Sequence, residues 1–181
     1  MKIIRIFTLA LLTCFATNSA HSQAFDIGDN VVALGIGLGS TYGHGFGYAG
    51  SGYRQSPAIN LQYERGMWEA GPGVISLGGF VGYKSFNYRD SDFSVNYTNI
   101  GVRSAYHYHG IDNDKIDVYG GLMLSYLNIN SNLGSLGSAS SGGLRFDLYV
   151  GGRYYFMENL AGFAELGFGF TVLNVGVALK F

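Results

Sequence analysis

FTVLNVGVALKF, residues 170–181, is the stretch of sequence that decides the fold. From Leu173 onward, apolar residues alternate with polar or small ones, so Lys180 and Phe181 point to opposite sides of an extended chain. Strict alternation of this kind indicates a β-strand with one apolar face. The strand finishes on an aromatic residue, which raises the question of what that residue does there.

The same alternation recurs in seven earlier segments of the 181-residue chain. With the last strand at 172–181, the predicted strands are 31–40, 58–65, 74–87, 97–108, 116–128, 144–156 and 160–169. Glycine is frequent (29 residues), proline is rare (2 residues) and 15% of residues are aromatic, as is typical of tightly packed β proteins. We therefore expect an all-β fold, an eight-stranded antiparallel up-and-down transmembrane β-barrel if its apolar face contacts lipid.

The N-terminal residues 1–22 have the organisation of a secretory signal peptide. A basic start is followed by an apolar stretch and then by small and polar residues. Cleavage is expected after Ser22, with Ala20 as the alternative. The predicted organisation is a signal peptide over 1–22 and a barrel domain over 23–181. The single cysteine, Cys14, falls inside the signal, where a lipoprotein acceptor is the less favoured interpretation.

One face of the predicted strands carries no charge, and the other carries small residues and nine charged ones. The charged residues are Glu64, Lys84, Arg103, Asp117, Arg145, Asp147, Arg153, Glu165 and Lys180. A soluble, lipocalin-like barrel would bury the apolar face, whereas a membrane barrel would turn it to lipid. Alternation alone does not choose between these two arrangements.

Three features favour the membrane arrangement. The small residues of the charged face suit a narrow lumen, and aromatic residues gather at the strand ends, where a membrane barrel has its girdles. Long connections, such as 41–56 and 130–143, alternate with shorter ones. We therefore expect the nine charged side chains to form a network of paired charges in the lumen, since eight strands leave room for little else.

Several stretches carry a resemblance to a known family. They are VISLGGFVGY, RSAYHYH, DVYGGLMLSY, GGRYYF and AELGFGFTVLNVGVALKF. The mature chain resembles the small eight-stranded outer-membrane β-barrel proteins of the OmpX/OmpA-transmembrane-domain type, especially the "outer membrane beta-barrel protein" family common in Bacteroidetes. The resemblance implies the bacterial outer membrane as location, its lipid as surroundings and the barrel-assembly machinery as a partner during biogenesis. It also implies that Phe181 is the assembly signal read by that machinery.

The residues point to no chemistry beyond this. His107 and His109 share one strand face, but two histidines without an obvious third ligand are weak evidence for a metal. No nucleophile paired with a base is recognisable, so no catalytic site, metal or cofactor is expected. A net charge of −1 gives no reason to expect nucleic acid as a partner.

The functional expectation is therefore a non-enzymatic outer-membrane barrel, structural or engaged in surface contacts. The glycine-rich connection after the first strand offers aromatic candidates for contact with an extracellular ligand, namely Tyr42, Phe46, Tyr48 and Tyr53. The alternatives are an outer-membrane enzyme that modifies lipid A and a narrow pore for small solutes.

Overall fold

The structure is a computed structural model that describes residues 24–42, 53–88, 93–111, 113–134 and 137–181. Its strands are β1 (Asn30–Leu38), β2 (Tyr53–Gln55), β3 (Ala58–Glu69), β4 (Gly73–Tyr88), β5 (Phe93–Tyr108), β6 (Ile116–Leu133), β7 (Ser138–Tyr155), β8 (Leu160–Phe168) and β9 (Leu173–Lys180). Over the described residues, no helix has the length and apolar character needed to cross a membrane.

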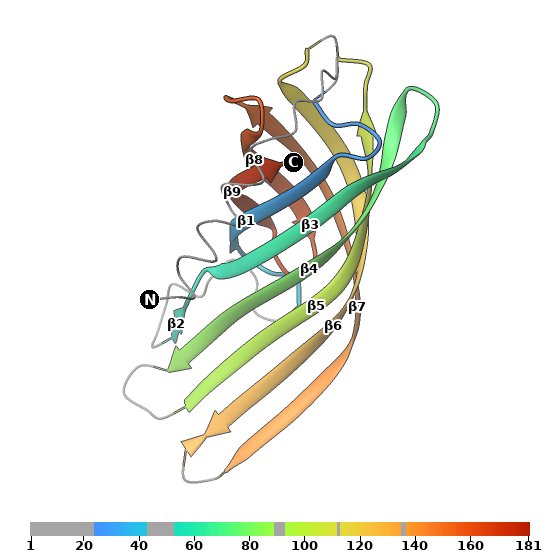
Figure 1. Cartoon of the computed structure of the whole chain (residues 1–181). Coiled ribbons are helices and arrows are strands. Elements are labelled where there is room, and N and C mark those ends of the chain that lie inside the picture. Colours follow the sequence, from blue (N-terminus) through green and yellow to red (C-terminus); the bar gives the residue numbers. More distant parts are fainter. Residues whose placement is uncertain (1–23, 43–52, 89–92, 112, 135–136) are drawn as a thin grey trace, which may run out of the picture.

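Eight of these strands close into a ring. Their order is β1-β3-β4-β5-β6-β7-β8-β9, every neighbouring pair is antiparallel, and β9 pairs back with β1. The short β2 pairs with the far end of β4 and extends the line of β3 beyond Pro57 (Figure 1). The expectation of an all-β, eight-stranded, antiparallel up-and-down barrel is confirmed.

The barrel has two different ends, which we call the turn end and the loop end. The turn end holds the β3–β4, β5–β6 and β7–β8 connections, together with the start of β1 and the end of β9. Strands β4 to β7 are 16 to 18 residues long, whereas β1, β8 and β9 are only 8 or 9 residues long. The additional residues of β4 to β7 lie at the loop end. The ends of β4 to β7 therefore stand beyond the rim as an extended sheet, at the lower left of Figure 1.

This extended sheet differs from the sequence-based expectation. The sequence predicts a long connection over residues 130–143, most of which are asparagine, serine or glycine. In the structure, the pairs Asn130↔Ser140 and Asn132↔Ser138 continue the β6–β7 ladder almost to its tip. Cross-strand pairing has overridden local propensity, so the connection between β6 and β7 is short.

The outer surface of the ring is apolar over most of its height. Ile100 and Val150 are each 61% exposed, although neither lies at an end of its strand. On β6 the apolar outward positions begin at Ile116 and end at Tyr126. Ten residues span about 33 Å along a strand, or roughly 25 Å along the barrel axis at the usual tilt of ~40°. This apolar belt has the height of a bilayer's hydrocarbon core in outer-membrane barrels.

Candidate functional site: the filled lumen and the extended sheet

Side chains fill the lumen in two layers. The layer nearer the turn end is an ion cluster, which consists of Glu64, Arg103, His107, Asp117, Arg153 and Glu165. The layer nearer the loop end is an aromatic layer, which consists of Phe80, Met123, Leu127 and Phe170 with Lys84 among them. The exposed fraction of every one of these side chains is below a tenth.

Strand register and small residues together place the ion cluster. Asp117 and Arg153 face one another as a cross-strand pair on β6 and β7. Glu165 lies opposite Gly151, where a Cβ atom would come within 2.8 Å of the Glu165 Cγ atom. Glycine at position 151 therefore gives the Glu165 side chain the space it needs to turn into the lumen.

The carboxylates and guanidinium groups of the cluster alternate in space. Arg103 Nη2 lies 2.7 Å from Glu165 Oε1, and Arg103 Nε lies 2.9 Å from Glu64 Oε1. Arg153 then joins Glu64, through Nη2, to Asp117, whose Oδ2 is 3.0 Å from Nη1. Three carboxylates thus share two guanidinium groups, and neither arginine is left without an acidic partner.

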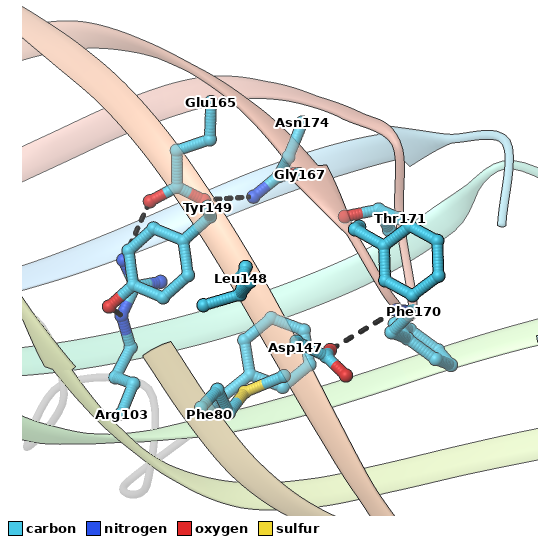
Figure 2. Close-up of a pocket in the computed structure, with 12 residues that line it drawn as sticks. Phe80, Arg103, Asp147, Leu148, Tyr149, Glu165, Gly167, Phe170, Thr171 and Asn174 are labelled. Atoms are coloured by element: carbon cyan, nitrogen blue, oxygen red, sulfur yellow. Dashed lines mark hydrogen bonds and ion pairs between the residues drawn. The ribbon is translucent and has the colours of Figure 1, made fainter. Parts of the chain in front are cut away.

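Neutral groups complete the coordination of Glu165. The Tyr119 hydroxyl donates to Oε1 at 3.0 Å, while the Gln62 and Asn174 amides donate to Oε2 at 3.1 and 3.0 Å. Figure 2 shows Glu165 between Arg103 and Asn174. A buried carboxylate with this many donors is fixed in position, because any other rotamer would leave several polar groups unpaired.

The structure also brings together a serine, a histidine and an aspartate that the sequence did not reveal. His107 Nε2 lies 3.1 Å from Ser76 Oγ, and His107 Nδ1 lies 2.8 Å from Asp117 Oδ1. These residues lie on β4, β5 and β6 without a sequence motif, so the expectation that no serine–histidine pair exists was wrong. The order of groups is that of a nucleophile, a base and an orienting carboxylate.

This Ser76–His107–Asp117 arrangement is closed to a substrate. Ser76 and His107 both have 0% exposure, and the Phe25 ring stacks on His107 with 3.9 Å between ring centroids. Asp117 also pairs with Arg153, which ties it into the ion cluster. The three residues act as a buried hydrogen-bond relay between strands.

Phe25 belongs to a segment before β1 that closes the turn end of the lumen. Its side chain is 1% exposed, and its carbonyl oxygen lies 2.8 Å from His109 Nε2. Lys180 Nζ donates to the carbonyl oxygen of Ala24 at 3.0 Å and lies 3.5 Å from Asp29. We call residues 24–29 the N-terminal plug.

The β8–β9 turn closes the other end. Phe170 points into the lumen, its backbone N–H donates to Asp147 Oδ2 at 3.1 Å, and its carbonyl oxygen accepts from Lys84 Nζ at 3.1 Å. Gly169 precedes it with a φ of +152°, and a Cβ there would collide with the Asp147 carboxylate. Between the two layers remains a cavity of about 30 Å³, lined by Arg103 and Phe170 among others, with room for about one water molecule (Figure 2).

Tyr42 reaches from the end of β1 across the mouth to β7. Its hydroxyl lies 2.5 Å from the Phe146 carbonyl oxygen and hydrogen-bonds with the Asp147 carboxylate. Burial, aided by the bond to Asp147, raises the pKa of Tyr42, so its hydroxyl remains a donor. The Arg145 guanidinium lies over the Tyr42 ring at 5.6 Å from the centroid.

The predicted lumen charges therefore separate into groups. Glu64, Arg103, Asp117, Arg153 and Glu165 meet in the ion cluster, as described above. Lys84 and Asp147 lie in and beside the aromatic layer, and Lys180 lies at the turn end beside the N-terminal plug.

Arg145 does not join the cluster, although it was predicted to do so. It lies eight residues before Arg153 on β7, about 26 Å away along the strand, and contacts Tyr42 at the mouth. Of the other loop candidates, Phe46 and Tyr48 lie outside the described residues, and Tyr53 is described only as part of β2. Over the described part of the chain, no group of three or more potential ligands could hold a metal ion.

The comparisons with known proteins agree with this architecture. No family model matches the chain, and no curated protein matches it. Among solved structures, it is similar to the N-terminal β-barrel domain of Pseudomonas aeruginosa OprF, with 16% identity, a TM-score of 0.55, and coverage of 86% of this chain and 98% of that one. It is also similar to Ail, the attachment invasion locus protein of Yersinia pestis, in complex with the heparin analogue sucrose octasulfate. The likeness to Ail has 12% identity and a TM-score of 0.54, and covers 85% of this chain and 96% of that one. At such identities the likeness shows the fold alone.

Proposed function

We propose that the chain is an integral protein of the bacterial outer membrane, exported with residues 1–22 as a cleaved signal peptide. The observation that carries this proposal is the inverted polarity of the barrel. Ile100 and Val150 are well exposed on the outside, whereas Arg103, Glu64 and Glu165 are buried inside. A water-soluble barrel would have the opposite arrangement, and only lipid is a favourable environment for the apolar belt.

In that membrane the turn end faces the periplasm and the loop end faces the exterior, because short turns are periplasmic in such barrels. We propose Phe181 as the assembly signal. It lies where the barrel closes, since Asn30 and Phe181 exchange backbone hydrogen bonds of 3.1 and 2.9 Å across β1 and the end of β9. Membership of the Bacteroidetes-type barrel family remains a prediction from the resemblance.

The barrel is non-enzymatic and acts through its exterior surface. Two layers of side chains fill the lumen, which argues against the narrow pore, and the Ser76–His107–Asp117 relay is closed by Phe25, which argues against the enzyme. At the exterior, β7 pairs with β8 only from Leu148 onward, so the part of β7 before Leu148 pairs with β6 alone. Such a strand edge can bind an extended segment of another protein by strand addition.

A surface ligand of another kind is suggested by Ail, whose structure contains a sulfated sugar analogue. In this chain a comparable anion would meet Arg145, the cation stacked on Tyr42 at the mouth. The assignment of Tyr42, Phe46, Tyr48 and Tyr53 as loop contacts is part of the same proposal.

Measurements of location, conductance and enzymatic activity test the proposed function. Membrane fractionation should recover the protein in the outer membrane, and planar-bilayer recordings should show no steady conductance. A soluble periplasmic protein would overturn the membrane proposal and restore the lipocalin-like alternative. The enzymatic alternative requires that a fluorophosphonate probe label the wild type but not Ser76→Ala, or that expression change the mass spectrum of lipid A. Either result would overturn the non-enzymatic assignment.

A further inference from the structure

The outward face of β4 to β7 changes character at one level. A row formed by Val81, Ile100, Tyr126 and Leu144 is the last apolar row, and the next row toward the exterior is Tyr83, Thr98, Asn128 and Gly142. Beyond it β6 presents Asn130 and Asn132, which pair with serine or asparagine on both neighbouring strands. The apolar belt thus ends abruptly, and a polar face follows on the same strands.

Within β4 to β7 this polar face contains no charge, and Arg54 of β2, which pairs with Asn87, borders it. From the Tyr83 row to the tip of the extended sheet, the described outward positions of β4 to β7 hold asparagine, serine, threonine, one tyrosine and one glycine. The side chains share one surface, as the bonds from the Tyr83 hydroxyl to Asn96 Oδ1 at 2.9 Å and from Asn130 Nδ2 to Asn128 Oδ1 at 2.5 Å show. We call it the amide face.

Exposure to water alone does not explain the amide face. Asparagine is among the least favoured residues in strands, so three of them at alternating positions of β6 weaken local propensity. Exposed sheets near an open edge usually carry lysine or other charges, which prevent association. The amide face contains poor strand formers and no charged residues. This composition is what we expect of a surface that hydrogen-bonds to a neutral ligand.

The position of the face identifies the neighbour. It continues the belt that contacts lipid and begins with the row of Tyr83, directly above Tyr126 in the last apolar row; these two tyrosines are 49% and 51% exposed. Beyond this boundary, the four steps from Asn128 to Asn132 rise about 13 Å along the strand. In an outer membrane, that zone beside a barrel is occupied by the sugar head groups of the outer-leaflet glycolipid.

We propose that the amide face binds the neutral, hydroxyl-bearing sugars of the glycolipid that surrounds the barrel, an inference that rests on the proposed outer-membrane location. Amide and hydroxyl groups both donate and accept hydrogen bonds, which matches the hydroxyls of a saccharide. Phosphate and sulfate groups bind best to arginine or lysine, which the described outward positions of β4 to β7 lack, and Arg54 of β2 pairs only with Asn87 at the edge of the face. The occupant is therefore the part of the glycolipid beyond its charged groups.

The test replaces the amides without weakening the strand. The triple variant Asn128→Val, Asn130→Val, Asn132→Val removes three amides, leaves no polar side-chain atom in their place and introduces a better strand former, so its melting temperature in detergent should equal or exceed that of the wild type. The control is Ser131→Thr, on the opposite face of the same strand. The full chain is reconstituted into phosphatidylcholine vesicles with either complete-core lipopolysaccharide or lipid A, and retained glycolipid is counted by native mass spectrometry after extraction.

Wild type and Ser131→Thr should retain complete-core lipopolysaccharide in preference to lipid A. The triple variant should lose this preference roughly tenfold, because amides that hydrogen-bond the sugars are gone. Equal preference in the wild type and in the stable triple variant would overturn the proposal. A chain that stays in the aqueous phase and does not enter the vesicles would instead overturn the membrane location itself, so the two failures are distinguishable.

Discussion

Replacing Arg103 by methionine should destabilise the barrel more than any change on its surface. Methionine keeps most of the side-chain volume but removes the guanidinium that lies 2.7 Å from Glu165 and 2.9 Å from Glu64. It also removes the cation above the Tyr149 ring, 4.2 Å from the centroid. Three buried carboxylates would then share Arg153 alone.

The contacts set the magnitude of this effect. At an effective dielectric constant of about 20, one unit-charge pair 2.7 Å apart is worth roughly 6 kcal/mol before the desolvation of either partner is subtracted. Measured losses after removing one partner of a buried pair are about 3–5 kcal/mol. We expect Arg103→Met to lower the free energy of unfolding by this amount. Glu165→Gln should lose only about 1–3 kcal/mol, because Arg103 keeps Glu64 and the new amide still meets Tyr119.

A double-mutant cycle measures the pair directly. Arg103→Met combined with Glu165→Gln leaves no acid at position 165, so the loss should fall short of the sum of the single losses by about 1–3 kcal/mol. The free energy of unfolding is obtained by urea titration in lipid vesicles. The fluorescence of Trp68, the chain's single tryptophan, exposed on the outside near the turn end, reports the transition. Additive losses, or an Arg103→Met loss below about 1 kcal/mol, would refute the reasoning that the cluster is dry and coupled.

Three further predictions concern the surface and the ends of the barrel. Leu124→Arg, in the apolar belt, should lower the free energy of unfolding in lipid by about 2–4 kcal/mol. Asn128→Arg, on the same strand and face, should change it little, because position 128 lies outside the hydrocarbon. Equal effects of the two changes would contradict the upper boundary of the belt between these positions. Phe25→Ala should lower stability by about 3–5 kcal/mol, or less if water fills the space, while planar bilayers should still show no conductance, because Phe170 closes the loop end; steady conductance would contradict the second seal. Deletion of Phe181 should reduce assembled barrel in cells more than refolding into vesicles, as measured by heat-modifiable electrophoretic mobility; an equal reduction in both would leave Phe181 only an interfacial role.

Alternation along the chain was sufficient to predict the ring. It located all eight strands, because side chains that point alternately to lipid and lumen leave a period-two pattern in the sequence. It underestimated β5, β6 and β7 at the loop end, where both faces of the extended sheet depart from this pattern. There the outward positions become polar, as at Asn130, while the inward positions include Tyr97 and Ile129. The alternation used to find the strands assumes apolar outward positions and polar inward ones. It cannot identify the part of a strand in which the outward positions are polar and the inward ones apolar.

The contents of the lumen were only partly predictable. The alternation along each strand placed Arg103, Asp117 and Glu165 on the inward side. Which charges pair with one another depends on the register between neighbouring strands, and alternation does not determine that register. The structure pairs Asp117 with Arg153 and leaves Arg145 at the mouth. The pairing of Ser76 with His107 was not predictable for the same reason, since the two residues belong to different strands and form no motif together.

Whether the barrel is closed depends on residues outside the strands. Phe25 lies before β1 and covers His107, while Phe170 lies in the β8–β9 turn and packs against Phe80 at 5.9 Å between ring centroids. No periodicity reveals either insertion, because each follows from the path of a connection. The strands determine that an eight-stranded lumen is narrow, and these two phenylalanines determine that it is sealed at both ends. Chains with the same strands but other connections can therefore differ in permeability while keeping the same fold.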